Sequence, residues 1–302
     1  MGKKIRHFIN LPAIGADTLK GILKHAHALK AEKYNPPQLL EGLSLAMVFD
    51  KRSTRTRISF EVAMKQLGGH TVVMGMGEMQ IAGSETIEDT SKVLSRFVDA
   101  VMLRMSSHEN MEELARWATI PVINGMTDQS HPCQIMADLL TIEEKLGGVE
   151  GKKIAWFGDY NNVCTTFEQA APLFGFDLVI STPPDLQPAK LGAHATYIED
   201  AKAAAKDADV IVTDTWVSMG QEGKAIEKFM PYQVNPELMA QAKDGAIFMH
   251  CMPIHQNEEV TKDVLNTPAS VIYDEAENRL HAQKAILAWC LADAGVRVKK
   301  KG

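Results

Sequence analysis

Short apolar runs alternate with helical patterns along the chain. Residues 43–49 form a near-continuous apolar run of strand length, which is typical of a strand buried on both faces. Residues 17–33 place apolar side chains on one face at helical spacing, with Asp17 as the expected N-cap. A second helix is expected through Leu67, where Gly68-Gly69 would end it. Further strands are predicted at residues 71–74, 100–103, 121–123, 154–157, 178–180, 210–213 and 246–249.

This alternation of strands and helices indicates parallel sheets joined by right-handed crossovers. The same pattern restarts after Gly147-Gly148, and 302 residues have room for about two domains. We therefore expect an α/β protein of two domains, each with a parallel sheet flanked by helices, joined near residues 140–150. The last helix, about residues 277–294, could pack on either domain.

Composition excludes several classes of protein. Hydrophobic residues make up 45% and charged residues 23%, which excludes a mainly disordered chain. A net charge of -6 makes nucleic acid an improbable partner, because that binding needs a broad basic surface. No apolar run is long enough to cross a membrane, and the N-terminus does not resemble a signal peptide. The four cysteines form no close pair, so we expect no CxxC metal site and a reducing cytoplasmic setting.

The segment DKRSTRTR, residues 50–57, directly follows the first buried strand. Ligands bind at the carboxyl ends of parallel strands. Cations at the start of a helix are unfavourable unless an anion is present, because the helix N-terminus already carries positive potential. Backbone N–H groups, hydroxyls and a guanidinium make a phosphate cradle. A solvated charged turn is the alternative, and the order Ser-Thr-Arg-Thr after a buried strand favours the cradle.

Four further polar residues of the chain are candidates for the same site. Arg104 follows a predicted strand and could meet either a surface acid or a phosphate. His131 precedes Pro132, which suits a first helical turn, and could donate to a polarised carbonyl oxygen. Gln134 lies one turn later. Arg279 lies among acids at the opening of the last helix, where a structural ion pair is the alternative.

The second half offers different groups after its strands. Residues 158–162, GDYNN, lack the GxGxxG pattern, which weakens a dinucleotide-binding interpretation. Asp214 could hold a cationic amine or cap a turn. Cys251 could be a small buried residue or a thiol tuned by a nearby charge. His250 is adjacent in sequence, but it cannot be assumed to face Cys251.

Together these segments resemble the aspartate/ornithine carbamoyltransferase family, and its ornithine branch in particular. The resemblance covers nearly the whole chain in the expected order. STRTR and HPxQ mark the carbamoyl-phosphate half, whereas the segment DTWVSMG, residues 214–220, resembles the ornithine-binding loop. The motifs are Ser53-Thr54-Arg55-Thr56-Arg57, Gln80-Ile81, Arg104, His131-Pro132-Cys133-Gln134, Gly158-Asp159, Asn161-Asn162, Asp214, Ser218-Met219-Gly220, His250-Cys251-Met252-Pro253 and Ala276-Glu277-Asn278-Arg279-Leu280-His281.

The resemblance implies a carbamoyl-phosphate-binding domain at residues 1–145, with a C-terminal helix of about 280–302 packing back on it, and an ornithine-binding domain at 146–279. The implied carbamoyl-phosphate contacts are Ser53, Thr54, Arg55, Thr56, Gln80, Arg104, His131, Gln134, Cys251, Met252 and Arg279. The implied ornithine contacts are Asn162, Asp214, Ser218 and Met219. The implied catalytic groups are Arg104, His131, Asp214 and Cys251.

The implied reaction is attack of the ornithine side-chain amine on the carbamoyl carbon, which gives citrulline and phosphate for arginine metabolism. Cationic donors stabilise the oxyanion that develops. The amine, with an ordinary pKa near ~10.4, must first lose a proton. Asp214 and Cys251 are the pair expected to manage that proton.

The resemblance also implies partners and assembly. Carbamoyl phosphate and L-ornithine would be the ligands, with no metal or organic cofactor, in a cytoplasmic homotrimer or multiple of trimers. A loop carrying Gln80 would enter the neighbouring subunit's site. Three alternatives remain: a carbamoyltransferase for putrescine or an N-acylated ornithine, an inactive relative that only binds ligand, and a nicotinamide-dependent dehydrogenase.

Overall fold

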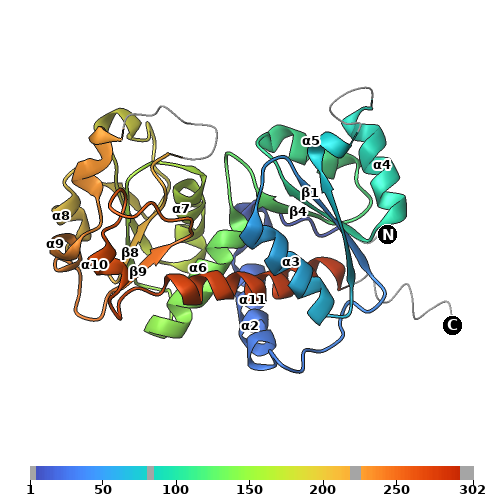
Figure 1. Ribbon diagram of the computed structural model, residues 1–302, viewed down its shortest axis with the longest axis horizontal. Coiled ribbons are helices and arrows are strands. Elements are labelled where there is room, and N and C mark those ends of the chain that lie inside the picture. Colours follow the sequence, from blue (N-terminus) through green and yellow to red (C-terminus); the bar gives the residue numbers. More distant parts are fainter. Residues whose placement is uncertain (1–4, 80–84, 218–225, 293–302) are drawn as a thin grey trace. The chain divides into compact units, whose positions relative to one another are not determined.

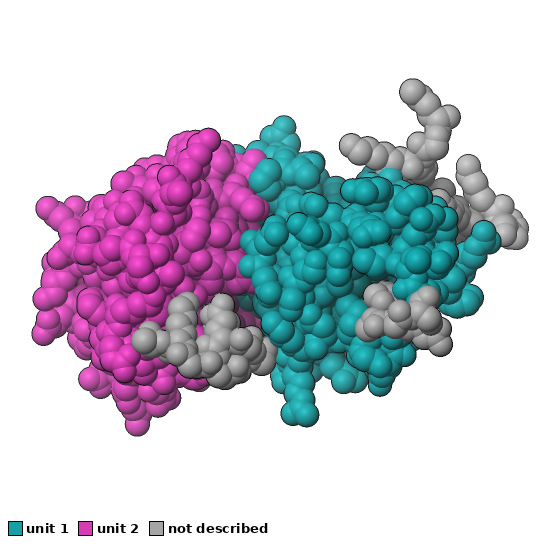
Figure 2. Space-filling view, turned by 90° about the horizontal axis from the view of Figure 1, so that it is seen from above, with its two compact units in different colours: residues 1–137, 279–302 teal, residues 138–278 magenta. Residues whose placement is uncertain are grey.

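The computed structural model describes residues 5–79, 85–217 and 226–292. The chain divides into two compact units (Figure 2). Unit 1 comprises Met1–Ala137 and Arg279–Gly302, and unit 2 comprises Asp138–Asn278. The binding of carbamoyl phosphate by one unit and of ornithine by the other stays a prediction.

Among the described residues of unit 1, the sheet has four parallel strands in the order β2-β1-β3-β4. Figure 1 labels two of them, β1 and β4. The strands are β1 (Ser44–Phe49), β2 (His70–Gly75), β3 (Ala100–Arg104) and β4 (Val122–Met126). The two inner strands, β1 and β3, are the apolar runs of the sequence, and most of their residues are buried. The helices are α1 (Leu11–Ile14), α2 (Ala16–Ala31), α3 (Thr54–Gln66), α4 (Ile87–Phe97) and α5 (His108–Trp117), with a 3-10 turn η1 (Met76–Glu78).

The described part of unit 2 holds five parallel strands in the order β7-β6-β5-β8-β9. They are β5 (Lys153–Phe157), β6 (Asp177–Ser181), β7 (Ala195–Tyr197), β8 (Val210–Thr213) and β9 (Ile247–His250). The helices are α7 (Asn162–Phe174), α8 (Ala201–Ala205), α9 (Pro236–Met239) and α10 (Lys262–Leu265), with 3-10 segments η3 (Pro184–Leu186) and η4 (Glu227–Tyr232). Helices α6 (Pro132–Leu146) and α11 (Ile272–Leu291) each contribute residues to both units.

The architecture confirms the predicted fold class, with three differences in detail. Strand β7 lacks an apolar run and was not predicted, because its three residues are only partly buried or exposed. Asp17 lies in the first turn of α2, whose N-cap is Gly15. Helix α11 begins at Ile272, earlier than expected. Within the described ranges, no helix is long and apolar enough to span a bilayer.

Candidate active site

The start of α3 has the features expected of an anion-binding turn. Ser53 is the N-cap of α3 in extended conformation, but its side chain makes no capping hydrogen bond among the described contacts. The first turn of α3 carries no acidic residue that would offset the positive end of the helix. Asp50 fixes the approach to this turn, because its Oδ2 accepts from the Ser106 backbone N at 2.7 Å and from the Ser106 hydroxyl at 3.0 Å.

Two guanidinium groups meet at the buried hydroxyl of Thr56. Arg104, at the end of β3, donates from Nη1 to Thr56 Oγ1 at 3.1 Å, and Arg279 donates from Nη2 to the same oxygen at 3.3 Å. Arg279 Nη1 also donates to Gln134 Oε1 at 2.6 Å. Two cations beside one neutral oxygen repel each other, and an anion bound there would offset that cost. The structure therefore brings four of the predicted residues together.

His131 lies at the same cluster, immediately before α6. It is buried, and its pKa is lowered well below the usual value by burial, with Arg279 and Arg104 lowering it further. The imidazole is therefore neutral at neutral pH and can act as a neutral hydrogen-bond donor to a carbonyl oxygen. The preceding turn is held by Thr127, whose backbone N donates to Ser130 O at 2.9 Å and whose hydroxyl accepts from Ser130 N at 3.2 Å.

Other candidates of the first half have different positions. Arg55 is half-buried in the first turn of α3, and Thr54 is exposed. Arg57, in the same turn, points to the surface, where its Nε is 2.8 Å from Glu61 Oε1. Gln80 lies outside the described residues.

In unit 2, the turn between β5 and α7 depends on a glycine. Gly158 has a φ of +106°, and a Cβ atom there would lie 2.6 Å from Trp216 Nε1. The residue after this turn, Asn161, caps α7: its Oδ1 accepts from Val163 N at 2.9 Å and from Cys164 N at 3.2 Å. Asn162 follows as the first residue of α7 and is half-buried.

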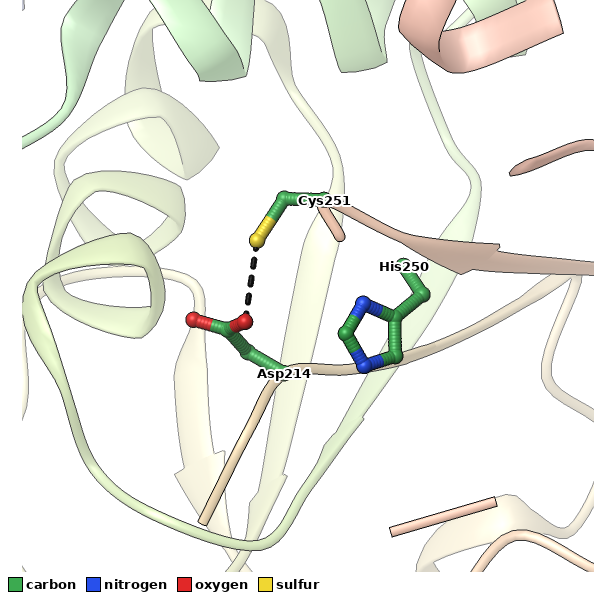
Figure 3. A group of neighbouring side chains, drawn as sticks. All are labelled: Asp214, His250 and Cys251. Atoms are coloured by element: carbon green, nitrogen blue, oxygen red, sulfur yellow. Dashed lines mark hydrogen bonds between the residues drawn. The ribbon is translucent and has the colours of Figure 1, made fainter. Parts of the chain in front are cut away.

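Asp214 and Cys251 meet at the carboxyl ends of the neighbouring strands β8 and β9 (Figure 3). The Cys251 thiol donates to Asp214 Oδ1 at 3.0 Å. Asp214 also accepts from Thr215 N at 2.8 Å and, through Oδ2, from Asn161 Nδ2 at 2.8 Å. Burial, followed by Asp214 itself, raises the pKa of Cys251 well above the usual value. The thiol is therefore a hydrogen-bond donor at neutral pH and not a thiolate.

His250 makes different contacts, although it is adjacent to Cys251 in sequence. Its Nδ1 accepts from the Met252 backbone N at 2.9 Å, so the ring proton is on Nε2, which lies 3.0 Å from Glu259 Oε1. Neither ring nitrogen is engaged with the thiol. Met252 has a φ of +58°, a rare backbone conformation for a side chain of this size.

Two groups of side chains have the spacing of metal ligands among the described residues. The ligand atoms of Asp214, His250 and Cys251 lie within 4.8 Å of one another, as do those of His255, Glu258 and Glu259. In the first group, hydrogen bonds already account for the positions of the carboxylate, the imidazole and the thiol. These positions therefore give no separate reason to assign a metal ion there.

Two contacts of the candidate site were not predicted from the sequence. Asn161 bonds Asp214, and the signal was an asparagine at the N-cap position. The role of Asn162 in ornithine binding stays a prediction. Glu259 fixes the His250 ring, and no local pattern in the sequence indicated it. Ser218 and Met219 lie outside the described residues.

Fold and site together are those of a two-domain α/β enzyme with its polar groups at the carboxyl ends of parallel strands. Residues 6–144 match the aspartate/ornithine carbamoyltransferase carbamoyl-P binding domain, and residues 150–290 match the Asp/Orn binding domain of the same family. The chain therefore belongs to the aspartate/ornithine carbamoyltransferase family.

Individual relatives are similar over almost the full length. The chain is 53% identical to the ornithine carbamoyltransferase of Brucella abortus (strain 2308), with 97% of each chain covered. It is 50% identical to that of Bradyrhizobium diazoefficiens, over 96% of this chain and 98% of the relative. The solved ornithine carbamoyltransferase from Pyrococcus furiosus superposes with a TM-score of 0.89 at 47% identity, covering 94% of this chain and 96% of that one.

Proposed function

We propose that this chain is an ornithine carbamoyltransferase, which transfers the carbamoyl group of carbamoyl phosphate to the side-chain amine of L-ornithine. The observation that carries the proposal is the 53% identity to an ornithine carbamoyltransferase over 97% of both chains. The Asp214–Cys251 pair supports it, because a carboxylate beside a protonated thiol suits a cationic amine.

In unit 1, the cluster around Thr56 binds carbamoyl phosphate. Ser53, Thr54, Arg55 and Thr56 hold the phosphate at the positive end of α3, and Arg104 neutralises its charge. Thr56, Arg104 and neutral His131 donate to the carbonyl oxygen, where negative charge develops as the amine attacks. Gln134 and Arg279, already joined by a hydrogen bond of 2.6 Å, orient the carbamoyl end.

In unit 2, Asn162, Asp214, Ser218 and Met219 bind ornithine. Asp214 attracts the side-chain ammonium and accepts a hydrogen bond from it. Transfer of that proton to Asp214 leaves a neutral amine as the nucleophile. Cys251 orients the carboxylate by donating to one of its oxygens. Backbone groups of Cys251 and Met252 complete the carbamoyl contacts.

The proposed function is tested by offering carbamoyl phosphate with a panel of amines. The purified protein should form citrulline from L-ornithine with a kcat/KM at least about a hundredfold above that for putrescine, N-acetyl-L-ornithine or L-aspartate. Colorimetric detection of the ureido product, confirmed by mass spectrometry, measures each reaction. A preference for another amine would replace the substrate, and no product with any amine would contradict the activity.

We also propose a pathway, a cellular compartment and an oligomeric state for the enzyme. The reaction serves arginine biosynthesis in the cytoplasm, and the enzyme acts as a homotrimer in which Gln80 of one subunit reaches the carbamoyl phosphate of the next. The support for the trimer is the resemblance of residues 75–83 to the family's inter-subunit loop.

Subunit exchange tests the proposed contribution of Gln80. Gln80→Ala and Arg55→Ala should each be nearly inactive, because each removes a ligand contact. If one site takes Arg55 from one chain and Gln80 from the next, mixed trimers contain some intact sites, and mixing should restore part of the citrulline-forming activity. Native mass spectrometry of differently tagged subunits confirms exchange. Exchange without recovery would show that Gln80 acts within its own chain.

A further inference from the structure

The backbone groups on the outer edge of β9 are hydrogen-bonded first by a chain segment and then by a side chain. Within the described sheet of unit 2, β9 is an edge strand. The segment before α11 pairs with its first part, because Phe248 N donates to Ala269 O at 2.8 Å and Val271 N donates to Phe248 O at 3.0 Å. The next outward N–H, that of His250, donates to Glu275 Oε2 at 2.8 Å. Since a buried N–H requires an acceptor, Glu275 extends the pairing to the residue before Cys251.

Glu275 is itself hydrogen-bonded to a second acid. The partner is Asp138 of α6, and both residues are buried, with exposures of 1% for Glu275 and 2% for Asp138. An ionised carboxylate has only acceptor atoms, so two carboxyl groups form a hydrogen bond only when one carries a proton. The contact therefore requires one proton shared between Asp138 and Glu275.

The ionisable groups around this pair in unit 2 come from neighbouring elements. They are Asp214, which follows β8, and Cys251, which follows β9. Asp214 is the third acid of this region, beside Asp138 and Glu275. Burial, and then Asp138, raise the pKa of Glu275 well above its usual value. After burial and Asp214, the negative charge of the pair formed by Glu275 and Asp138 also raises the pKa of the Cys251 thiol.

We propose that Asp138 and Glu275 share one proton and act as positioning residues, which hold the end of β9 so that the Cys251 thiol meets Asp214. This inference rests on the proposed function, because Cys251 and Asp214 are the residues proposed to handle the ornithine amine. The proton lets Glu275 bond Asp138 while its Oε2 still accepts from His250 N. A second negative charge in the pair would instead drive the two side chains apart.

The shared proton predicts how stability depends on pH. In the unfolded chain Glu275 loses its proton near pH ~4.3, whereas in the folded chain it keeps the proton to a higher pH. Stability from this group is therefore complete below the unfolded pKa and is lost as pH rises towards the folded pKa. Glu275→Gln mimics the protonated acid, because its amide can donate to Asp138 and accept from His250 N, and its stability has no such dependence.

The first experiment compares thermal or urea unfolding of the wild type and Glu275→Gln between pH 5 and 9. Relative to the variant, the wild-type folding equilibrium constant should fall about tenfold per pH unit, until the folded pKa is reached. Asp274→Asn is the matched control, because Asp274 is the preceding acid of the same helix and pairs at the surface with Lys145 at 3.1 Å. Its curve should run parallel to that of the wild type. Parallel curves for Glu275→Gln would overturn the shared proton.

The second experiment measures positioning by kinetics. Glu275→Ala removes the acceptor of His250 N and should lower kcat/KM for ornithine at least tenfold, with KM for carbamoyl phosphate changed less than threefold. Glu275→Gln should retain at least ten times the kcat/KM of Glu275→Ala. Equal defects in the two variants would contradict the shared proton, and normal ornithine kinetics in Glu275→Ala would contradict positioning.

If Glu275→Ala does not fold, the comparison of Glu275→Gln with the wild type decides whether the proton is shared. The unfolding curves need no activity, so failure of the proposed function would be seen separately, as a wild type that makes no citrulline.

Discussion

Arg55→Ala is expected to lower kcat/KM for carbamoyl phosphate by at least about a hundredfold while the protein stays folded. Arg55 lies in the first turn of α3, half-buried, where its guanidinium can hold the phosphate through two parallel hydrogen bonds. Alanine is a good helix former, so the backbone of α3 should be preserved. Steady-state kinetics at saturating ornithine measure the loss, and circular dichroism checks the fold.

Arg57→Ala is the matched control for this prediction. Arg57 has the same charge and lies in the same helical turn, but it pairs with Glu61 on the exposed face at 2.8 Å. Exposed pairs of this kind contribute little to stability, so this variant should keep near-normal kinetics. Equal losses in both variants would mean that a general loss of positive charge, rather than a direct contact by Arg55, explains the effect.

The fold was predictable where buried elements give the sequence a clear apolar pattern. Strands β1 and β3 are central, so both of their faces are apolar and the runs are nearly continuous. Strand β7 is three residues long at a sheet edge, with no buried residue, and short partly exposed strands have no comparable pattern. The prediction of Asp17 as the N-cap of α2 was wrong. The N-cap is Gly15, which has no side chain to form a capping hydrogen bond and so leaves no signal in the sequence.

Residue types at strand ends predicted which residues belong to the candidate site. Which of these residues contact one another could be read only from the structure. Arg279 bonds Thr56 across 223 positions of the chain, and no spacing rule connects two such distant residues. The contact between Asn161 and Asp214 shows the same limit, since adjacent asparagines look alike in sequence. Only the geometry of the α7 cap directs the Asn161 amide to Asp214.

Charge states were the least accessible property of the sequence. The sequence suggested that a nearby charge could tune the thiol of Cys251. The structure gives the direction: burial and Asp214 raise its pKa, so the thiol stays protonated. His131 is likewise neutral because it is buried beside two arginines, Arg104 and Arg279. Both effects depend on burial and on distances between residues far apart in the chain.

Asp214→Asn is expected to lower kcat/KM for ornithine by about a hundredfold or more, with a loss in both affinity and rate. The substitution removes the negative charge that attracts the ammonium group. An amide has one oxygen, so its NH₂ would face one of two donors: Asn161 Nδ2, which donates to Asp214 Oδ2 at 2.8 Å, or Thr215 N, which donates to Oδ1 at 2.8 Å. Asn161 cannot turn its oxygen to this partner without giving up the α7 cap, because Oδ1 already accepts from Val163 N and Cys164 N.

The measurement is a pH series of citrulline formation together with calorimetric binding of carbamoyl phosphate alone. In the wild type, kcat/KM for ornithine should rise with pH as the amine, with an ordinary pKa near ~10.4, loses its proton. Carbamoyl phosphate binding should be nearly the same in wild type and Asp214→Asn, because its proposed side-chain contacts lie mainly in unit 1. Asp177→Asn, which neutralises an exposed acid at the start of β6, is the control and should change neither quantity. Equal losses in the binding of both ligands by Asp214→Asn would indicate a structural role for Asp214 and contradict its role in handling the ornithine amine.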